Sequence, residues 1–336
     1  MKPALLVSQK VISEFGPRLN QILGSASQPL EMIALTKDLK IAPEQLASIA
    51  AAYYSRDVWE GTTKSALTPM AGAFWNIVDR APGLKWLSVF SSGTDHQQYQ
   101  NHLQRGVRLT TGAGAQAEPV ATAAITGLLA LARGLTEWIA AQRKGEWTPF
   151  SGKNIPPDLR GQTAVIVGTG HIGTCIARVL QAVGMKTIGI RRNVASAEHF
   201  DDMQPLAALD TLLPACDWLV LACPLTPETR GLIDARRLAL LRPSAGLVNI
   251  ARGEIVDELA LTEALAAQRL RGAYLDVFTT EPLAKDSRLW QLPNVLISPH
   301  NAGASAGTYL RGVEIFLRNL DAYVNGRRLE NEAAAN

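Results

Sequence analysis

The feature that most restricts the fold of this chain is residues 163–173, TAVIVGTGHIG, where an apolar run leads directly into closely spaced glycines. The run before Gly168 has the β-branched, apolar composition of a buried parallel strand. After the glycines, apolar residues recur at helical spacing over residues 176–180. A strand, a glycine turn and a helix in this order predict a parallel α/β sheet with a ligand site at the turn.

The spacing of Gly168, Gly170 and Gly173 is that of a dinucleotide-binding turn. In such a turn the first glycine permits the tight bend, the second lets the backbone approach a pyrophosphate, and the third lets helix and strand pack closely. The first amides of the helix and its positive dipole end then bind the phosphates. The segment therefore predicts a site for NAD(H) or NADP(H) rather than a plain glycine-containing loop.

The end of the next apolar run, residues 186–190, is where such sites distinguish the two cofactors. Arg191 and Arg192 follow it, and the next carboxylate along the chain is Glu198. A carboxylate at the strand end would accept a hydrogen bond from the ribose 2′-hydroxyl, whereas guanidinium groups bind a 2′-phosphate. The sequence therefore favours NADP(H). NAD(H) stays possible if one arginine stacks on the adenine and the other faces solvent.

Later in the chain, apolar runs deliver polar residues at or just beyond their ends. These segments are residues 248–253 with Arg252, residues 275–283 with Asp276 and Glu281, and residues 297–300 with His300. The carboxyl ends of parallel strands share one edge of the sheet, where open α/β folds bind their ligands. We therefore expect Arg252, Glu281 and His300 to lie in one site.

These side chains suit the reduction of a 2-oxo acid. The reaction needs a cation for the carboxylate and carbonyl, a hydride donor, and an acid that protonates the forming alkoxide. Arg252, NAD(P)H and His300 fill these roles. A neighbouring carboxylate would favour the imidazolium and fix its tautomer, and Glu281 is the candidate. Any of the three alone could equally be a surface charge or a structural histidine.

Together with the glycine turn, these segments resemble the D-isomer-specific 2-hydroxyacid dehydrogenase family, whose motifs end in Arg-Gly, in acidic-Val-Phe-x-x-Glu-Pro and in Pro-His. The resemblance, of the glyoxylate/hydroxypyruvate reductase type, runs from about Leu84 to about Leu320. It implies that Arg252, Glu281 and His300 are catalytic in producing a D-2-hydroxy acid. Nothing in the sequence selects glyoxylate, hydroxypyruvate or a larger 2-oxo acid.

The resemblance also implies a set of cofactor-binding residues. They are Gly168, Thr169, Gly170, His171, Ile172, Gly173, Arg191, Arg192, Cys223, Pro224, Thr229, Ile250, Ala251, Arg252, Asp276, His300, Ala302 and Gly303. Asp276 is expected to hold the nicotinamide carboxamide and so fix the ring face. The alternative is a carboxylate that caps a loop.

Residues 90–95, FSSGTD, follow another apolar run and resemble the family loop whose amides bind the substrate carboxylate. The implied substrate-binding residues are Ser92, Gly93, Thr94, Arg252 and His300. A simple polar turn is the alternative for the loop. Residues 53–56 are weaker candidates for the pocket that receives the substrate side group.

The order of elements predicts an α/β protein with a Rossmann-type coenzyme domain inserted into a smaller flavodoxin-like α/β substrate domain. The first strands are expected at residues 4–8, 30–36, 50–55, 85–90 and 106–109. The predicted substrate domain comprises residues 1–113 and 305–336, and the dinucleotide-binding domain residues 114–304. The active site is expected in the cleft between them.

Residues 119–132 are apolar on nearly all sides, which predicts a helix buried between domains or subunits. The matching helix of the family lies at a dimer interface, so we expect a homodimer. The amphipathic segment 305–325 is expected to return and pack on the first domain.

Composition argues against several other partners. The net charge of +3 is spread over 336 residues, so we expect neither nucleic acid nor a membrane as partner. The N-terminal MKPALLV is too short in apolar residues for a signal peptide, and a cytoplasmic protein is expected. The cysteines lack metal-ligand spacing and are expected to be reduced core residues, so no metal is predicted. His96, His102 and His199 lie in polar stretches and are expected to be exposed.

One alternative from another class stays open. Some relatives with this fold and an intact catalytic trio act as nucleotide-sensing transcriptional corepressors. Those proteins usually carry disordered extensions, whereas only residues 331–336 lie outside the predicted folded body. The sequence therefore favours the enzyme.

Overall fold

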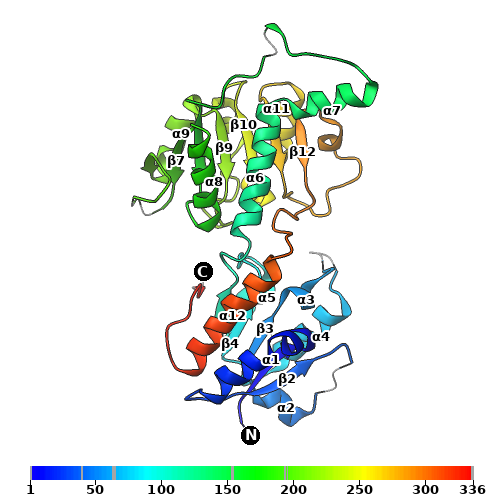
Figure 1. Ribbon diagram of the computed structural model, residues 1–336, viewed down its shortest axis with the longest axis vertical. Coiled ribbons are helices and arrows are strands. Elements are labelled where there is room, and N and C mark those ends of the chain that lie inside the picture. Colours follow the sequence, from blue (N-terminus) through cyan, green and yellow to red (C-terminus); the bar gives the residue numbers. More distant parts are fainter. Residues whose placement is uncertain are drawn as a thin grey trace. The chain divides into compact units, whose positions relative to one another are not determined.

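The computed structural model describes residues 2–38, 41–62, 66–152, 155–192, 194 and 196–333. The chain divides into two compact units: unit 1, Met1–Gln116 with Ser305–Asn336, and unit 2, Ala117–Ala304. Each unit is built on its own parallel sheet, so the chain is an α/β protein (Figure 1). The first division falls after Gln116, a few residues beyond the predicted position, and the second falls after Ala304.

Unit 1 contains a five-stranded sheet in the order β2-β1-β3-β4-β5, which is the order of flavodoxin-like folds. The strands are β1 (Ala4–Ser8), β2 (Glu31–Leu35), β3 (Ile49–Tyr54), β4 (Trp86–Val89) and β5 (Arg108–Thr111). The helices are α1 (Gln9–Gly24), α2 (Pro43–Ser48), α3 (Arg56–Trp59), α4 (Pro69–Arg80), α5 (Gln97–Gln104) and α12 (Thr308–Val324). Strand β5 begins later than predicted because Gly106, with φ of 79°, still belongs to the preceding turn.

The C-terminal helix α12 packs on unit 1, as its amphipathic pattern predicted (Figure 1). Phe316 of α12 stacks on Tyr53 of β3, with ring centroids 4.0 Å apart. Tyr53 and Tyr54 are only 1% and 2% exposed. The expectation that these tyrosines line a substrate pocket is wrong, because both rings are part of the core of unit 1.

Unit 2 contains a seven-stranded sheet in the order β12-β11-β10-β9-β6-β7-β8. The strands are β6 (Thr163–Val167), β7 (Lys186–Ile190), β8 (Asp202–Gln204), β9 (Trp218–Leu221), β10 (Gly246–Asn249), β11 (Gly272–Leu275) and β12 (Val295–Ile297). Counted from β6, this is the strand order of a Rossmann fold with one more strand at the edge. The predicted Rossmann-type fold is therefore confirmed.

The helices of unit 2 lie between these strands and before the first of them. They are α6 (Ala117–Ala132), α7 (Leu135–Lys144), α8 (His171–Ala182), α9 (Leu209–Leu212), α10 (Ala235–Leu240) and α11 (Glu258–Ala266). Short 3-10 turns cover η2 (Leu206–Ala208), η3 (Leu213–Ala215), η4 (Gly253–Ile255) and η5 (Arg288–Gln291).

Helix α6 packs on the sheet of its own unit. A Cβ atom at Gly127 would lie 2.3 Å from Cγ of Tyr274 on β11, so the helix backbone contacts this ring directly. This packing accounts for the apolar character that predicted a helix between domains or subunits. Within the described residues no single helix is long and apolar enough to span a membrane, although α6 and α7, bent by 67°, pass that test as a pair.

Two of the histidines expected to be exposed are not: His199 is half-buried, and His102 is 1% exposed. His102 lies on the inner side of α5 together with Tyr99 and Leu103, which are also buried. Its Nε2 atom lies 2.9 Å from Oδ1 of Asp79. Burial raises the pKa of Cys216 to about 12 and that of Cys223 to about 11, as expected of core thiols, but Cys175 is only half-buried.

Candidate active site

The turn between β6 and α8 has the geometry that its glycines predicted. Gly168 adopts φ of 101°, and a Cβ atom there would lie 2.6 Å from the carbonyl carbon of Ala222. At Gly173 a Cβ atom would lie 2.0 Å from the carbonyl oxygen of Gly168, so helix and strand can pack this closely only without a side chain. Around Gly170, by contrast, no atom lies within 4 Å of the position of a Cβ atom.

This open space lies at the start of helix α8. Gly170 is the N-cap and provides no side-chain cap, and the first turn of the helix carries no acidic residue. Backbone amides at a helix N-terminus attract an anion, and a glycine there lets it come close. The turn therefore fits the pyrophosphate of a dinucleotide.

The other predicted cofactor-binding residues follow neighbouring strands of the same sheet. Arg191 and Arg192 follow β7; Cys223, Pro224 and Thr229 follow β9; Ile250, Ala251 and Arg252 follow β10; Asp276 follows β11; and His300, Ala302 and Gly303 follow β12. All these strands are parallel to one another. Unit 2 therefore brings this whole set to one edge of its sheet, where open α/β folds bind ligands.

The segment after β7 contains a contact that the sequence did not predict. Nη2 of Arg192 lies 3.2 Å from Oε2 of Glu228, a residue of the loop after β9. The same Oε2 accepts a hydrogen bond of 2.7 Å from the hydroxyl of Thr226. A carboxylate therefore lies at the position that selects the cofactor, although none follows Arg192 closely in the sequence.

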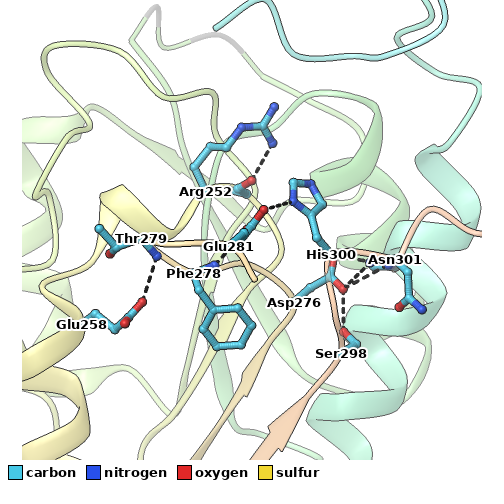
Figure 2. Close-up of polar contacts among 11 residues, drawn as sticks. Arg252, Glu258, Asp276, Phe278, Thr279, Glu281, Ser298, His300 and Asn301 are labelled. Atoms are coloured by element: carbon cyan, nitrogen blue, oxygen red, sulfur yellow. Dashed lines mark hydrogen bonds and ion pairs between the residues drawn. The ribbon is translucent and has the colours of Figure 1, made fainter. Parts of the chain in front are cut away.

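Glu281 and His300 form a direct pair at the ends of β11 and β12. Nδ1 of His300 lies 2.8 Å from Oε2 of Glu281, while Oε1 of Glu281 accepts a 3.1 Å hydrogen bond from the amide of Phe278 (Figure 2). The Glu281 side chain is 12% exposed, against 42% for His300. The carboxylate of Glu281 is therefore mostly buried, and the imidazole of His300 is the more exposed group of the pair.

Arg252 follows β10 in a turn that Asn249 fixes. The buried Asn249 side chain donates to the carbonyl of Arg252 at 2.9 Å and accepts from the amide of Ala251 at 3.1 Å. The Arg252 side chain is half-buried, and its Nη1 donates to the carbonyl of Ala251 at 2.7 Å (Figure 2). Its guanidinium is therefore placed by short local contacts at the same edge of the sheet as His300.

Asp276 organises the segment that carries His300. Its carboxylate, 3% exposed, accepts hydrogen bonds from the hydroxyl of Ser298 at 2.5 Å and from the amides of Asn301 and Ala302 at 3.0 and 3.1 Å (Figure 2). His300 itself has φ of 49°, a conformation that few residues other than glycine adopt. Asp276 therefore makes the loop-capping contacts that were the alternative to its cofactor role, and these contacts hold the backbone around His300.

The predicted carboxylate-binding loop follows β4 in unit 1. The side chain of Gln100 donates to the carbonyl of Thr94 at 2.7 Å, and the hydroxyl of Tyr99 lies 3.2 Å from Oγ of Ser91. In the described part of the chain, the amides of Ser92, Gly93 and Thr94 donate no hydrogen bond. Helix α5 thus ties down the loop while these amides remain available to a ligand.

Comparison with known proteins gives a consistent result. Residues 125–302 match the family described as D-isomer specific 2-hydroxyacid dehydrogenase, NAD binding domain. A glyoxylate reductase of Thermococcus gammatolerans is 36% identical over 255 residues, 74% of this chain and 76% of the relative. A glyoxylate/hydroxypyruvate reductase B of Pectobacterium atrosepticum is 37% identical over 259 residues, 76% of this chain and 81% of the relative.

Solved structures show the same architecture over the full length. A crystal structure of an NADPH-dependent glyoxylate/hydroxypyruvate reductase from Sinorhizobium meliloti, in complex with NADP and sulfate, is similar with a TM-score of 0.76. It is 29% identical, and the match covers 99% of this chain and 98% of that one.

Proposed function

The chain belongs to the D-isomer-specific 2-hydroxyacid dehydrogenase family, and we propose that it reduces a small 2-oxo acid to the D-2-hydroxy acid with NADPH. The observation that carries this proposal is the 2.8 Å contact between His300 and Glu281 at the sheet edge that also bears the dinucleotide turn. The reduction of a carbonyl requires an acid of this kind to protonate the oxygen, whereas hydride transfer alone does not require one.

His300 is the proton donor in this proposal. When bound, NADPH supplies the hydride to the carbonyl carbon. Because Nδ1 of His300 is engaged by Glu281, Nε2 is the atom that donates a proton to the alkoxide oxygen. Glu281 stabilises the imidazolium before the transfer and keeps the ring oriented.

Arg252 and the loop of unit 1 bind the substrate in the proposed reaction. The guanidinium of Arg252 holds the carboxylate and polarises the carbonyl, and the amides of Ser92, Gly93 and Thr94 donate to the carboxylate. Besides capping the loop, Asp276 would hold the nicotinamide carboxamide through Oδ2, which among the described residues accepts only the 3.2 Å hydrogen bond from the Ala302 amide, and so fix the ring face that sets the D configuration. The dinucleotide turn and the exposed Arg191 and Arg192 support NADP(H), the cofactor present in the Sinorhizobium meliloti structure.

We further propose a homodimer. Helix α7 and the segment after it expose large apolar side chains, with Trp138 44%, Ile139 37% and Trp147 96% exposed. Exposed tryptophans of this kind are enriched at surfaces covered by another subunit. Sedimentation equilibrium tests this assignment. The cytoplasmic location expected from the sequence stays a prediction.

The function is tested by following NADPH oxidation with glyoxylate, hydroxypyruvate and larger 2-oxo acids. We expect turnover with at least one of them, and a loss of about 10²- to 10⁴-fold in kcat for His300→Asn with unchanged NADPH affinity. Nucleotide binding without turnover of any 2-oxo acid would contradict the proposal and favour the corepressor alternative. Normal turnover by His300→Asn would show that another group donates the proton.

A further inference from the structure

The ion pair between Arg192 and Glu228 changes the charge at the cofactor-selecting end of the sheet. The sequence places two guanidinium groups, Arg191 and Arg192, after β7. The fold adds a carboxylate from the loop after β9, with Oε2 of Glu228 3.2 Å from Nη2 of Arg192. One of the two positive charges that a 2′-phosphate would meet is therefore already paired.

We propose that Glu228 is a selectivity residue that weakens the preference of this site for the 2′-phosphate. This inference rests on the proposed use of a nicotinamide dinucleotide. A 2′-phosphate that binds Arg192 must displace or approach Glu228, and two like charges at short distance repel. A cofactor with a free 2′-hydroxyl meets no such repulsion, so Glu228 reduces the difference in affinity between NADPH and NADH.

Glu228 is held in place from its own loop. The hydroxyl of Thr226 donates to Oε2 of Glu228 at 2.7 Å, and this bond lowers the pKa of the carboxyl below its usual value. Thr226 is itself tied to Thr229, whose Oγ1 accepts from the amide of Thr226 at 2.8 Å. The carboxylate therefore stays charged and close to Arg192 at neutral pH.

Fragments of the cofactor separate this effect from catalysis. Isothermal titration calorimetry of wild type and Glu228→Gln with 2′,5′-ADP and with 5′-AMP, which lacks only the 2′-phosphate, measures the 2′-phosphate contribution directly. We expect Glu228→Gln to bind 2′,5′-ADP about 3- to 10-fold more tightly at low salt, with 5′-AMP binding unchanged. The gain should shrink in high salt because the charges are exposed.

Two variants make the test specific. Glu198→Gln removes the same charge from an exposed residue after Arg192, and we expect no gain in 2′,5′-ADP affinity. In an Arg192→Ala background, Glu228→Gln should lose most of its gain in 2′,5′-ADP affinity. The 2′-phosphate approaches Glu228 because it binds Arg192, so the two substitutions are not additive.

Unchanged or weaker 2′,5′-ADP binding in Glu228→Gln would overturn the inference. So would a loss of 5′-AMP affinity, which would mean that Glu228 accepts a hydrogen bond from the ribose 2′-hydroxyl instead. Both results are independent of the proposed reaction, whose failure would appear as nucleotide binding without turnover of any 2-oxo acid.

Discussion

Glu281 is fixed through both of its carboxylate oxygens, with Oε2 2.8 Å from Nδ1 of His300 and Oε1 3.1 Å from the amide of Phe278. The side chain therefore cannot turn away from the imidazole without losing a hydrogen bond to the backbone. A carboxylate held in this way favours the charged ring and fixes which nitrogen faces the substrate.

Replacing Glu281 by Gln tests the charge of this pair while keeping its shape. We expect kcat for 2-oxo acid reduction to fall about 10- to 100-fold, which corresponds to the loss of one charge-assisted hydrogen bond. The Kd for NADPH, measured by fluorescence titration, should stay within about twofold of wild type. A kcat equal to that of wild type would show that His300 does not depend on this carboxylate.

Arg252→Ala removes the proposed substrate anchor. We expect kcat/KM for the 2-oxo acid to fall about 10²- to 10³-fold, since a half-buried guanidinium that pairs with a carboxylate is lost. Arg252→Lys is the matched variant and should recover only part of the loss, because an ammonium group cannot form the two-pronged contact. Steady-state kinetics within tenfold of wild type for Arg252→Ala would exclude the anchoring role.

Replacing Gln100 tests whether the loop at residues 90–95 takes part in substrate binding, because Gln100 holds this loop and is not itself a proposed substrate-binding residue. Because its side chain holds the carbonyl of Thr94 at 2.7 Å, Gln100→Ala should raise KM for the 2-oxo acid about 2- to 10-fold. The control is Gln97→Ala on the same helix, because the Gln97 side chain donates to Oδ1 of Asn101 at 2.9 Å, within the helix and not to the loop. Equal kinetics for the two variants would show that the tie to Thr94 has no part in substrate binding.

His102 provides a prediction about stability and pH. Burial lowers the pKa of His102, with Arg105 acting in the same direction, and the contact with Asp79 opposes the effect without cancelling it. The unfolded chain therefore binds the proton more tightly. The stabilising contribution of neutral His102 to the free energy of unfolding is complete above the pKa of His102 in the unfolded chain, about 6.5. It is lost as the pH falls from there to the lower pKa in the folded protein.

The measurement is the free energy of unfolding in urea at several pH values between about 5 and 8. His102→Gln should show a flatter dependence than wild type over this range, whatever its absolute stability. His171→Gln, at an exposed residue, is the control and should keep the wild-type slope. A wild-type slope in His102→Gln would contradict this account of the buried histidine.

The features that the sequence predicted well are those encoded in consecutive residues or in the shared edge of a parallel sheet. The glycine turn is an example, because Gly168 and Gly173 are required by a backbone bend and by a contact within the same βα unit. The meeting of Glu281 and His300 was predicted because each follows a strand of one parallel sheet, and the carboxyl ends of such strands share an edge.

The features that the sequence did not predict depend on contacts between distant segments. Glu228 meets Arg192 only because β6 and β9 are neighbours and the loop after β9 returns toward the end of β7. His102 is buried because it shares the inner face of α5 with Tyr99 and Leu103, and the prediction of an exposed histidine missed this helical spacing. For Asp276 the sequence predicted the sheet edge but not the partner, because it left open whether the carboxylate caps the loop, and Ser298 was not identified as its contact.

The predicted preference for NADPH can be assigned to one of the two arginines. Within the described residues, Arg192 forms an ion pair and Arg191 forms none, so Arg191 carries the unpaired charge beside β7. Arg191→Asp should therefore invert or abolish the preference for NADPH over NADH, with a change of about one to three orders of magnitude in the ratio of the two KM values. The change should appear in KM rather than kcat, because the 2′-phosphate is far from the reacting carbon and contributes uniform binding. Titration of wild type and Arg191→Asp with both cofactors at fixed ionic strength measures it. Equal or better use of NADH by the wild type would contradict this assignment and show instead that Arg191 faces solvent or the adenine ring.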